Sequence, residues 1–289
     1  MPEASRTAVL VCQGRAVAHG RIAPGRFADP VAMSLLRGGE RDAVEVARAG
    51  TPPQGVSARI GYESLTAVAR TMVPRTVAVD DAVRERPGPQ LVILGAGLDG
   101  RAFRMAELSD VDVYEVDHPA SQADKRERAA GLRPVAGSLR WVPVDLARDA
   151  LGPALAAAGH DGTLATTWVW EGVVPYLRRA EVAATVRAVA GRSAPGSRLV
   201  VNYQSPSLKA TLGLGVARAM ARLSRRPDPT AREPRRSAWT PERFRALLAA
   251  GGWRVATDDD LLALATRLPS PTRHPSGMRT GRVAVADLA

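Results

Sequence analysis

The sequence has very little of what builds disulfides, metal centres or membrane spans. Cys12 is the only cysteine among 289 residues, which excludes an internal disulfide and a cysteine-based zinc site. No apolar run approaches the roughly 20 residues that a membrane helix needs. Residues 1–17 also lack the basic start and unbroken apolar stretch of a signal peptide. We therefore expect a cytoplasmic protein without a membrane partner.

Lysine is nearly absent. Lys125 and Lys209 are the only lysines, so 40 − 2 = 38 basic residues are arginine, and the net charge is +11. This skew, together with abundant alanine and glycine, indicates base-composition pressure on codons. A phosphate-binding surface needs a concentrated patch and not a high total, so we expect no nucleic-acid partner. The four histidines lack metal-ligand spacing, and no metal is expected.

The composition is that of a globular protein, with 45% hydrophobic and 24% charged residues. From residue 90 onward, short apolar runs alternate with helical stretches, a pattern typical of a parallel sheet. The predicted strands are residues 91–94, 111–116, 140–144, 165–170, 197–203, 253–257 and 282–286. The predicted helices between them are residues 101–108, 120–130, 150–158, 179–192 and 241–250. The fold class is therefore α/β.

Residues 1–86 are predicted to form an N-terminal helical cap, and residues 87–289 the core. The cap contains helical patterns at residues 6–18, 29–36, 40–49 and 57–72, and a further helix at residues 74–86 begins at Pro74. We expect a bend before that proline, because proline donates no backbone hydrogen bond.

One basic insertion, residues 205–239, interrupts the core. Eight basic residues against Asp228 and Glu233 give it 8 − 2 = +6 of the net charge. Its apolar residues recur every three or four positions, which predicts an amphipathic helix: Leu208, Leu212, Val216, Met220 and Leu223. Three interpretations of this helix are open. It can pack on the sheet with a solvated arginine face, form a lid over an anionic substrate, or bind a membrane surface or nucleic acid.

The glycine-rich turn after the first predicted strand is the strongest local signal. Gly95-Ala96-Gly97-Leu98-Asp99-Gly100 follows an apolar strand and opens a helix, and its glycines let a ligand approach the backbone. The turn also matches a dinucleotide fingerprint, with Glu115 twenty residues after Gly95. However, Asp99 places a carboxylate where a pyrophosphate needs amide donors. A cationic ligand such as S-adenosylmethionine (SAM), which carries an ammonium and a sulfonium, fits better.

Acidic residues follow the next three predicted strands. Asp117 ends the second strand, Asp145-Leu146 the third and Glu171 the fourth. In open α/β sheets, ligands bind at the carboxyl ends of parallel strands. Asp117 can accept hydrogen bonds from both ribose hydroxyls, and Asp145 from an adenine amine that Leu146 covers. Each acid alone can also be a helix cap, but all four acids together favour SAM.

These motifs together resemble the leucine carboxyl methyltransferase family, in its bacterial small-molecule O-methyltransferase branch. The resemblance rests on Gly95-Ala96-Gly97-Leu98-Asp99 with Arg101, Glu115-Val116-Asp117-His118-Pro119, Val144-Asp145-Leu146 and Glu171-Gly172-Val173-Val174-Pro175-Tyr176-Leu177. It implies a Rossmann-like class I methyltransferase fold, with seven mostly parallel strands and an antiparallel last strand. One departure is Gly100, where the family usually has threonine.

The resemblance also implies roles for individual residues. Arg59 is expected to pair with the methionine carboxylate of SAM, and Glu171 to lie near its ammonium. The predicted cofactor site consists of Arg59, Gly95, Ala96, Gly97, Asp99, Arg101, Glu115, Asp117, His118, Asp145, Leu146 and Glu171. No catalytic residue is assigned, and Tyr176 and Tyr62 are candidates for positioning the acceptor.

We therefore expect a SAM-dependent O-methyltransferase that methylates a carboxylate of a small natural-product acid by in-line transfer. A carboxylate is already ionised at neutral pH and needs no general base. The alternatives are an NAD(P)-dependent oxidoreductase and a non-catalytic domain that binds SAM. The expected partner is a small anionic substrate, and the sequence leaves the oligomeric state open.

Overall fold

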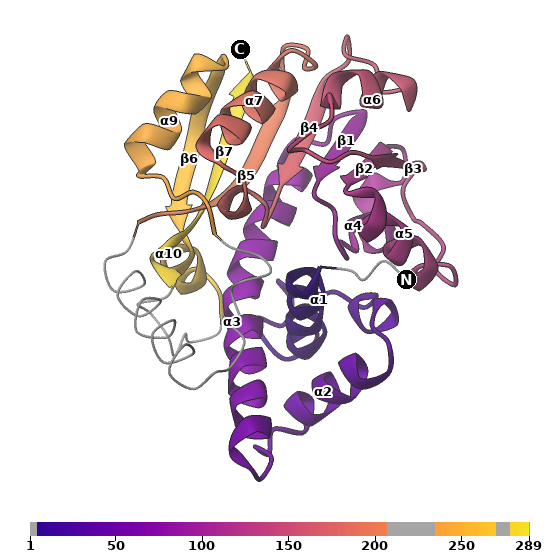
Figure 1. Ribbon diagram of the computed structural model, residues 1–289, viewed down its shortest axis with the longest axis vertical. Coiled ribbons are helices and arrows are strands. Elements are labelled where there is room, and N and C mark those ends of the chain that lie inside the picture. Colours follow the sequence, from indigo (N-terminus) through magenta and orange to yellow (C-terminus); the bar gives the residue numbers. More distant parts are fainter. Residues whose placement is uncertain (1–4, 207–234, 270–277, 289) are drawn as a thin grey trace.

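The computed structural model describes residues 5–206, 235–269 and 278–288. Its centre is a seven-stranded sheet in the order β3-β2-β1-β4-β5-β7-β6 (Figure 1). The strands are β1 (Gln90–Leu94), β2 (Asp112–Asp117), β3 (Ser138–Pro143), β4 (Thr166–Trp170), β5 (Arg198–Gln204), β6 (Trp253–Asp260) and β7 (Gly281–Leu288). Strand β7 is antiparallel to both neighbours, β5 and β6. The predicted fold class and the antiparallel last strand are confirmed.

Helices cover both faces of the sheet. One face carries α1 (Arg6–Ala18), α3 (Val56–Glu85), α4 (Arg101–Arg104), α5 (Pro119–Arg128) and α10 (Leu261–Thr266), and the other α6 (Leu151–Ala157), α7 (Arg179–Ala190) and α9 (Pro241–Ala250). Alternate strand residues serve the two layers because side chains alternate along a strand. In β1, Leu91 and Ile93 pack with the first layer, whereas Val92 and Leu94 pack with the second.

The predicted cap packs into the same core as the sheet. Its elements are α1, the short 3-10 helix η1 (Ala32–Leu35), α2 (Gly38–Ala49) and α3, and one buried cluster holds residues from all of them together with residues of the sheet. Helix α3 begins exposed at the bottom of the view and ends against the sheet (Figure 1). Residues 5–86 therefore pack as a layer against one face of the sheet.

The predicted break at Pro74 is wrong, because α3 is one continuous helix of 30 residues. An interior proline costs a helix about 3 kcal/mol. Buried neighbours offset that cost, since burying a side chain such as Val73 or Val77 contributes about 1.5–3 kcal/mol. Tertiary packing therefore outweighs the local signal.

Two other predicted helices are shorter than expected. Residues 29–36 form only η1, where Asp29 Oδ1 accepts a hydrogen bond from Ala32 N at 3.0 Å. Residues 101–108 divide into α4 and the 3-10 helix η2 (Ala106–Leu108). The amphipathic pattern at residues 208–223 lies outside the described residues. In the part of the chain that is described, no helix is long and apolar enough to cross a membrane.

Candidate active site at the carboxyl ends of the strands

Sheet register brings three of the predicted turns together. Leu94 is paired with Val116 on one side and with Trp170 on the other. The next residues, Gly95, Asp117 and Glu171, therefore leave the sheet at the same level from three adjacent parallel strands. Sequence alone indicated this meeting point only through the rule that ligands bind at these strand ends.

The glycine turn requires glycine at its first position. Gly95 has φ +66°, and a Cβ atom there would lie 2.2 Å from Val173 Cγ2. Gly97 has φ +47°, and its Cβ would lie 3.1 Å from Ala8 Cβ of α1. The turn is therefore packed between the loop after β4 and the first turn of α1.

Asp117 braces this turn from β2. Its Oδ2 accepts a hydrogen bond from Gly97 N at 2.5 Å, and its Oδ1 accepts one from His118 N at 2.6 Å. Burial raises the pKa of Asp117, while these two amides oppose the increase. His118 itself is exposed, and its Nδ1 accepts from Ala120 N at the start of α5, so in this structure its side chain is a helix cap.

Arg101 holds two of the predicted cofactor acids. Its side chain is 2% exposed; its Nη2 donates to Glu171 at 2.8 Å, and its Nη1 donates to Asp99. Two buried carboxylates at neighbouring strand ends repel each other unless a cation lies between them. Burial by itself would raise the pKa of both acids, but the nearby arginines lower the pKa of Asp99 and of Glu171. Both acids are therefore ionised at neutral pH.

Arg75 of α3 completes this end of the site. Its Nε donates to Glu171 Oε1 at 2.6 Å, and both side chains are about nine-tenths buried. Within the described residues, neither terminal nitrogen of Arg75 has a hydrogen-bond or ion-pair partner. A guanidinium with two free terminal nitrogens beside the carboxylate of Glu171 offers both signs of charge in one place.

The N-terminal segment closes over the same turn. Arg15 of α1 pairs with Asp29 at 2.7 Å and donates to the carbonyl of Leu98. A Cβ at Gly100 would lie 2.7 Å from Val31 Cγ2 and 3.3 Å from Asp29 Oδ1. Val31 and Asp29 thus occupy the space that a side chain at position 100 would need, which accounts for the glycine there.

Two predicted acids show a different environment. Glu115 is fully buried and pairs with Lys125 of α5, whose ammonium also lies 5.7 Å from the centre of the Trp141 ring. Burial raises the pKa of Glu115 to about 7. Asp145 is half-buried beyond β3, where its Oδ1 accepts a hydrogen bond from Ala147 N. Glu115 is therefore paired with Lys125 inside the sheet, before the carboxyl end of β2. Asp145 and the half-buried Leu146 lie just beyond the carboxyl end of β3, at the ligand-binding edge.

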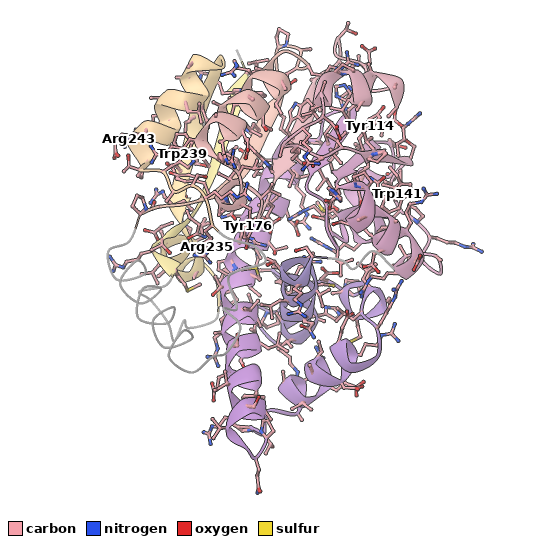
Figure 2. All side chains as sticks on the ribbon, in the orientation of Figure 1. Tyr114, Trp141, Tyr176, Arg235, Trp239 and Arg243 are labelled. Atoms are coloured by element: carbon pink, nitrogen blue, oxygen red, sulfur yellow. The ribbon has the colours of Figure 1, made fainter. Side chains whose placement is uncertain are left out.

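The structure does not bring Arg59 to the other site residues. Arg59 is exposed near the start of α3, sixteen positions before Arg75, which is about 24 Å along the helix. Tyr62 lies on the same outer part of α3, about 20 Å from Arg75. Tyr176, in the 3-10 helix η3 (Val174–Tyr176), follows Glu171 by five residues and lies near the carboxyl edge (Figure 2).

Sequence reasoning missed Arg75, Asp80, Arg15 and Asp29. A usable signal was present for the first two, because Arg75 and Asp80 interrupt an apolar stretch that includes Val73, Val77 and Val79. Charged residues inside the apolar part of a helix are almost never fully buried unless they are paired.

Residues 8–190 match the leucine carboxyl methyltransferase family. The chain belongs to this family. A protein of Frankia alni named as a SAM-dependent methyltransferase is 36% identical to this family member over 197 residues, which is 67% of this chain and 66% of that protein. A protein of the same name from Mycolicibacterium gilvum is 37% identical over 202 residues, 68% of this chain and 65% of that protein. The match therefore spans slightly less than two thirds of each relative.

The fold of this leucine carboxyl methyltransferase family member is also found among solved structures. A protein of Thermobifida fusca named as a methyltransferase has a TM-score of 0.56 at 17% identity, covering 100% of this chain and 97% of that one. At this identity the likeness shows the fold alone. The predicted family and the class I methyltransferase fold are confirmed.

Proposed function

We propose that this chain is a SAM-dependent methyltransferase that transfers a methyl group to a carboxylate oxygen of a small acid. The observation that carries the proposal is the pairing of charges beside the glycine turn. Among the described residues, the two terminal guanidinium nitrogens of Arg75 have no hydrogen-bond partner, and its Nε is paired with Glu171, which Arg101 links to Asp99. This arrangement matches a ligand that carries a carboxylate and an ammonium on one carbon, as the methionine end of SAM does.

The described residues fit the rest of the cofactor as well. Gly95 and Gly97 leave the turn without side chains. Asp117 has remaining lone pairs for the ribose hydroxyls, and Asp145 with Leu146 stands at the end of the next strand for adenine. In this proposal Arg75 takes the role that the sequence predicted for Arg59. When bound, SAM supplies a methyl group on a positively charged sulfur.

Methyl transfer to a carboxylate requires the protein mainly to position the acceptor. A carboxylate oxygen takes the methyl group without releasing a proton, so no general base is required. The protein must hold the acid in line with the methyl group and exclude water. We assign that task to Tyr176 and Arg235, both labelled in Figure 2. Backbone hydrogen bonds from Arg236 and Ser237 to the carbonyl of Pro175 join their two segments.

The alternatives fit less well. A dinucleotide-binding sheet keeps the order 3-2-1-4-5-6 with parallel strands, whereas here β7 enters antiparallel between β5 and β6. Asp99 also faces the turn where a pyrophosphate would lie. A SAM-binding domain without turnover remains an outcome of the test. The preference for a natural-product acid rests on the arginine-rich composition, which is typical of proteins from high-GC bacterial genomes. The preference for an anionic substrate rests on the basic insertion, residues 205–239.

The test has two stages on the full chain. Calorimetric titration with S-adenosylhomocysteine (SAH), alongside NAD(H) and NADP(H), identifies the cofactor. Saturable binding of SAH alone supports the proposal, and binding of a nicotinamide cofactor refutes it. Incubation with methyl-labelled SAM and a panel of carboxylic acids follows. A methyl ester releases labelled methanol in mild base, whereas N-methyl, C-methyl and ether products do not. SAH binding with no methylated product from any acid indicates a non-catalytic domain.

A further inference from the structure

Asp80 is a buried carboxylate of α3 to which the proposed function gives no role. It is 4% exposed. Its Oδ1 accepts from Arg101 Nε at 2.8 Å, and its Oδ2 lies 2.8 Å from Arg104 Nη2. Arg75 lies five residues earlier on the same helix. Helix α3 thus supplies one residue that reaches the proposed ligand directly and one that reaches it only through Arg101.

Arg101 distributes its donors among three carboxylates. Nε goes to Asp80, Nη1 to Asp99 and Nη2 to Glu171. A guanidinium is planar, and its donors keep fixed directions. The hydrogen bond to Asp80 therefore sets the plane in which the other two nitrogens meet the acids assigned to the ammonium of SAM. Without Asp80, only Asp99 and Glu171 themselves hold that plane.

The charges of the ion-paired cluster around Asp80 balance. Four arginines face four carboxylates: Arg15, Arg75, Arg101 and Arg104 against Asp29, Asp80, Asp99 and Glu171. The sum is 4 − 4 = 0, so the site accepts a ligand end whose own charges cancel. Neutralising Asp80 leaves an excess of one positive charge centred on Arg101 and Arg104. Such an excess disfavours an ammonium beside Asp99 and Glu171.

We propose that Asp80 is a positioning residue that tunes the site for the ammonium group of the cofactor by orienting and neutralising Arg101. The inference rests on the proposed function, because it concerns the same end of the same ligand. Asp80 touches neither the glycine turn nor Asp117, so the ribose and adenine contacts do not depend on it. Its loss therefore weakens ligands that carry the amino-acid end and spares ligands that lack it.

The experiment compares Asp80→Asn with a matched control on the next residue. Asp81 is also ion-paired, with Arg26 and Arg84, but its side chain is 45% exposed. The ligands are SAH and 5′-methylthioadenosine, which has the nucleoside but not the amino acid. We expect Asp80→Asn to weaken SAH binding about tenfold or more and methylthioadenosine binding less than twofold. Asp81→Asn leaves both unchanged.

The outcomes separate this inference from the proposed function. Wild-type protein that binds no SAH overturns both. Wild-type binding with an unchanged SAH affinity in Asp80→Asn, or an equal loss for both ligands, overturns only the role of Asp80. If Asp80→Asn does not fold, Asp80→Glu keeps the charge and displaces the anchor of Arg101. That variant must still lose more affinity for SAH than for methylthioadenosine, and an equal loss refutes the proposal.

Discussion

Arg75 and Arg59 provide a direct comparison, because both are arginines of α3 and only one lies at the site. Arg75 is nine-tenths buried against Glu171, whereas Arg59 is exposed about 24 Å along the helix. Replacing each by methionine removes the charge and keeps a long side chain with good helix propensity. Arg75→Met removes the two donors proposed for the ligand carboxylate, and Arg59→Met is the matched control.

The expected magnitude follows from the geometry. Losing one partner of a buried, hydrogen-bonded charge pair costs about 2–4 kcal/mol, so Arg75→Met should weaken SAH binding about thirtyfold to a thousandfold. Arg59→Met should change it less than about twofold, because exposed substitutions stay within about 0.5 kcal/mol. Methylthioadenosine lacks the carboxylate, and its affinity should change little in either variant.

The assay is calorimetric titration of each full-length variant with both ligands, with urea unfolding as a check on stability. Arg75→Met also leaves Arg101 as the remaining partner of Glu171. The free energy of unfolding of this variant should therefore fall by about 1–3 kcal/mol. A loss of SAH affinity in Arg59→Met comparable to that in Arg75→Met would falsify the assignment of Arg75, rather than Arg59, to the ligand carboxylate. An equal loss for SAH and methylthioadenosine in Arg75→Met would mean that the arginine only supports the fold.

Three further predictions concern the turn, the ribose acid and a buried histidine. Gly95→Ala should lower the free energy of unfolding by about 1–3 kcal/mol and impair SAH binding, because its methyl group meets Val173. Gly196→Ala has a similar φ of +84° but open space, and an equal effect on SAH binding there would contradict the steric account. Asp117→Asn should weaken SAH and methylthioadenosine alike by about tenfold or more, as titration can show. Burial lowers the pKa of His160 from 6.5 to about 4, so the unfolded chain gains that proton first and the contribution of His160 to stability should fall from pH 6.5 to 5 by up to about 2 kcal/mol. Glu115, whose pKa is raised to about 7, contributes in the opposite direction, so the effect of His160 is read from the difference between the wild type and His160→Gln. A pH series of urea unfolding in which His160→Gln keeps the same slope would exclude this cause.

Sequence patterns predicted most of the architecture because that part of the fold is governed by local periodicity. Strands β1, β4 and β5 are short apolar runs between turn signals. A strand that is buried on both faces of a sheet is recognisable from such a run alone. The glycine turn was recognisable because Gly95 and Gly97 adopt backbone conformations that other residues avoid. The acids at the strand ends could be assigned to the site because ligands bind at that edge of an open sheet.

The sequence by itself therefore determined the fold class, the family and the positions of Gly95, Asp99, Asp117 and Glu171. Only the tertiary structure decided which arginine of α3 faces them. The apolar stretch around Arg75 indicates that it is buried and paired, but only the packing of α3 against the sheet shows that its partner is Glu171. It also decided that α3 continues through Pro74, because core burial exceeds the local cost. Ion pairs such as Asp80 with Arg101 join residues that are distant in sequence, so no periodicity records them. Their partners are fixed by the packing of α3 against the sheet.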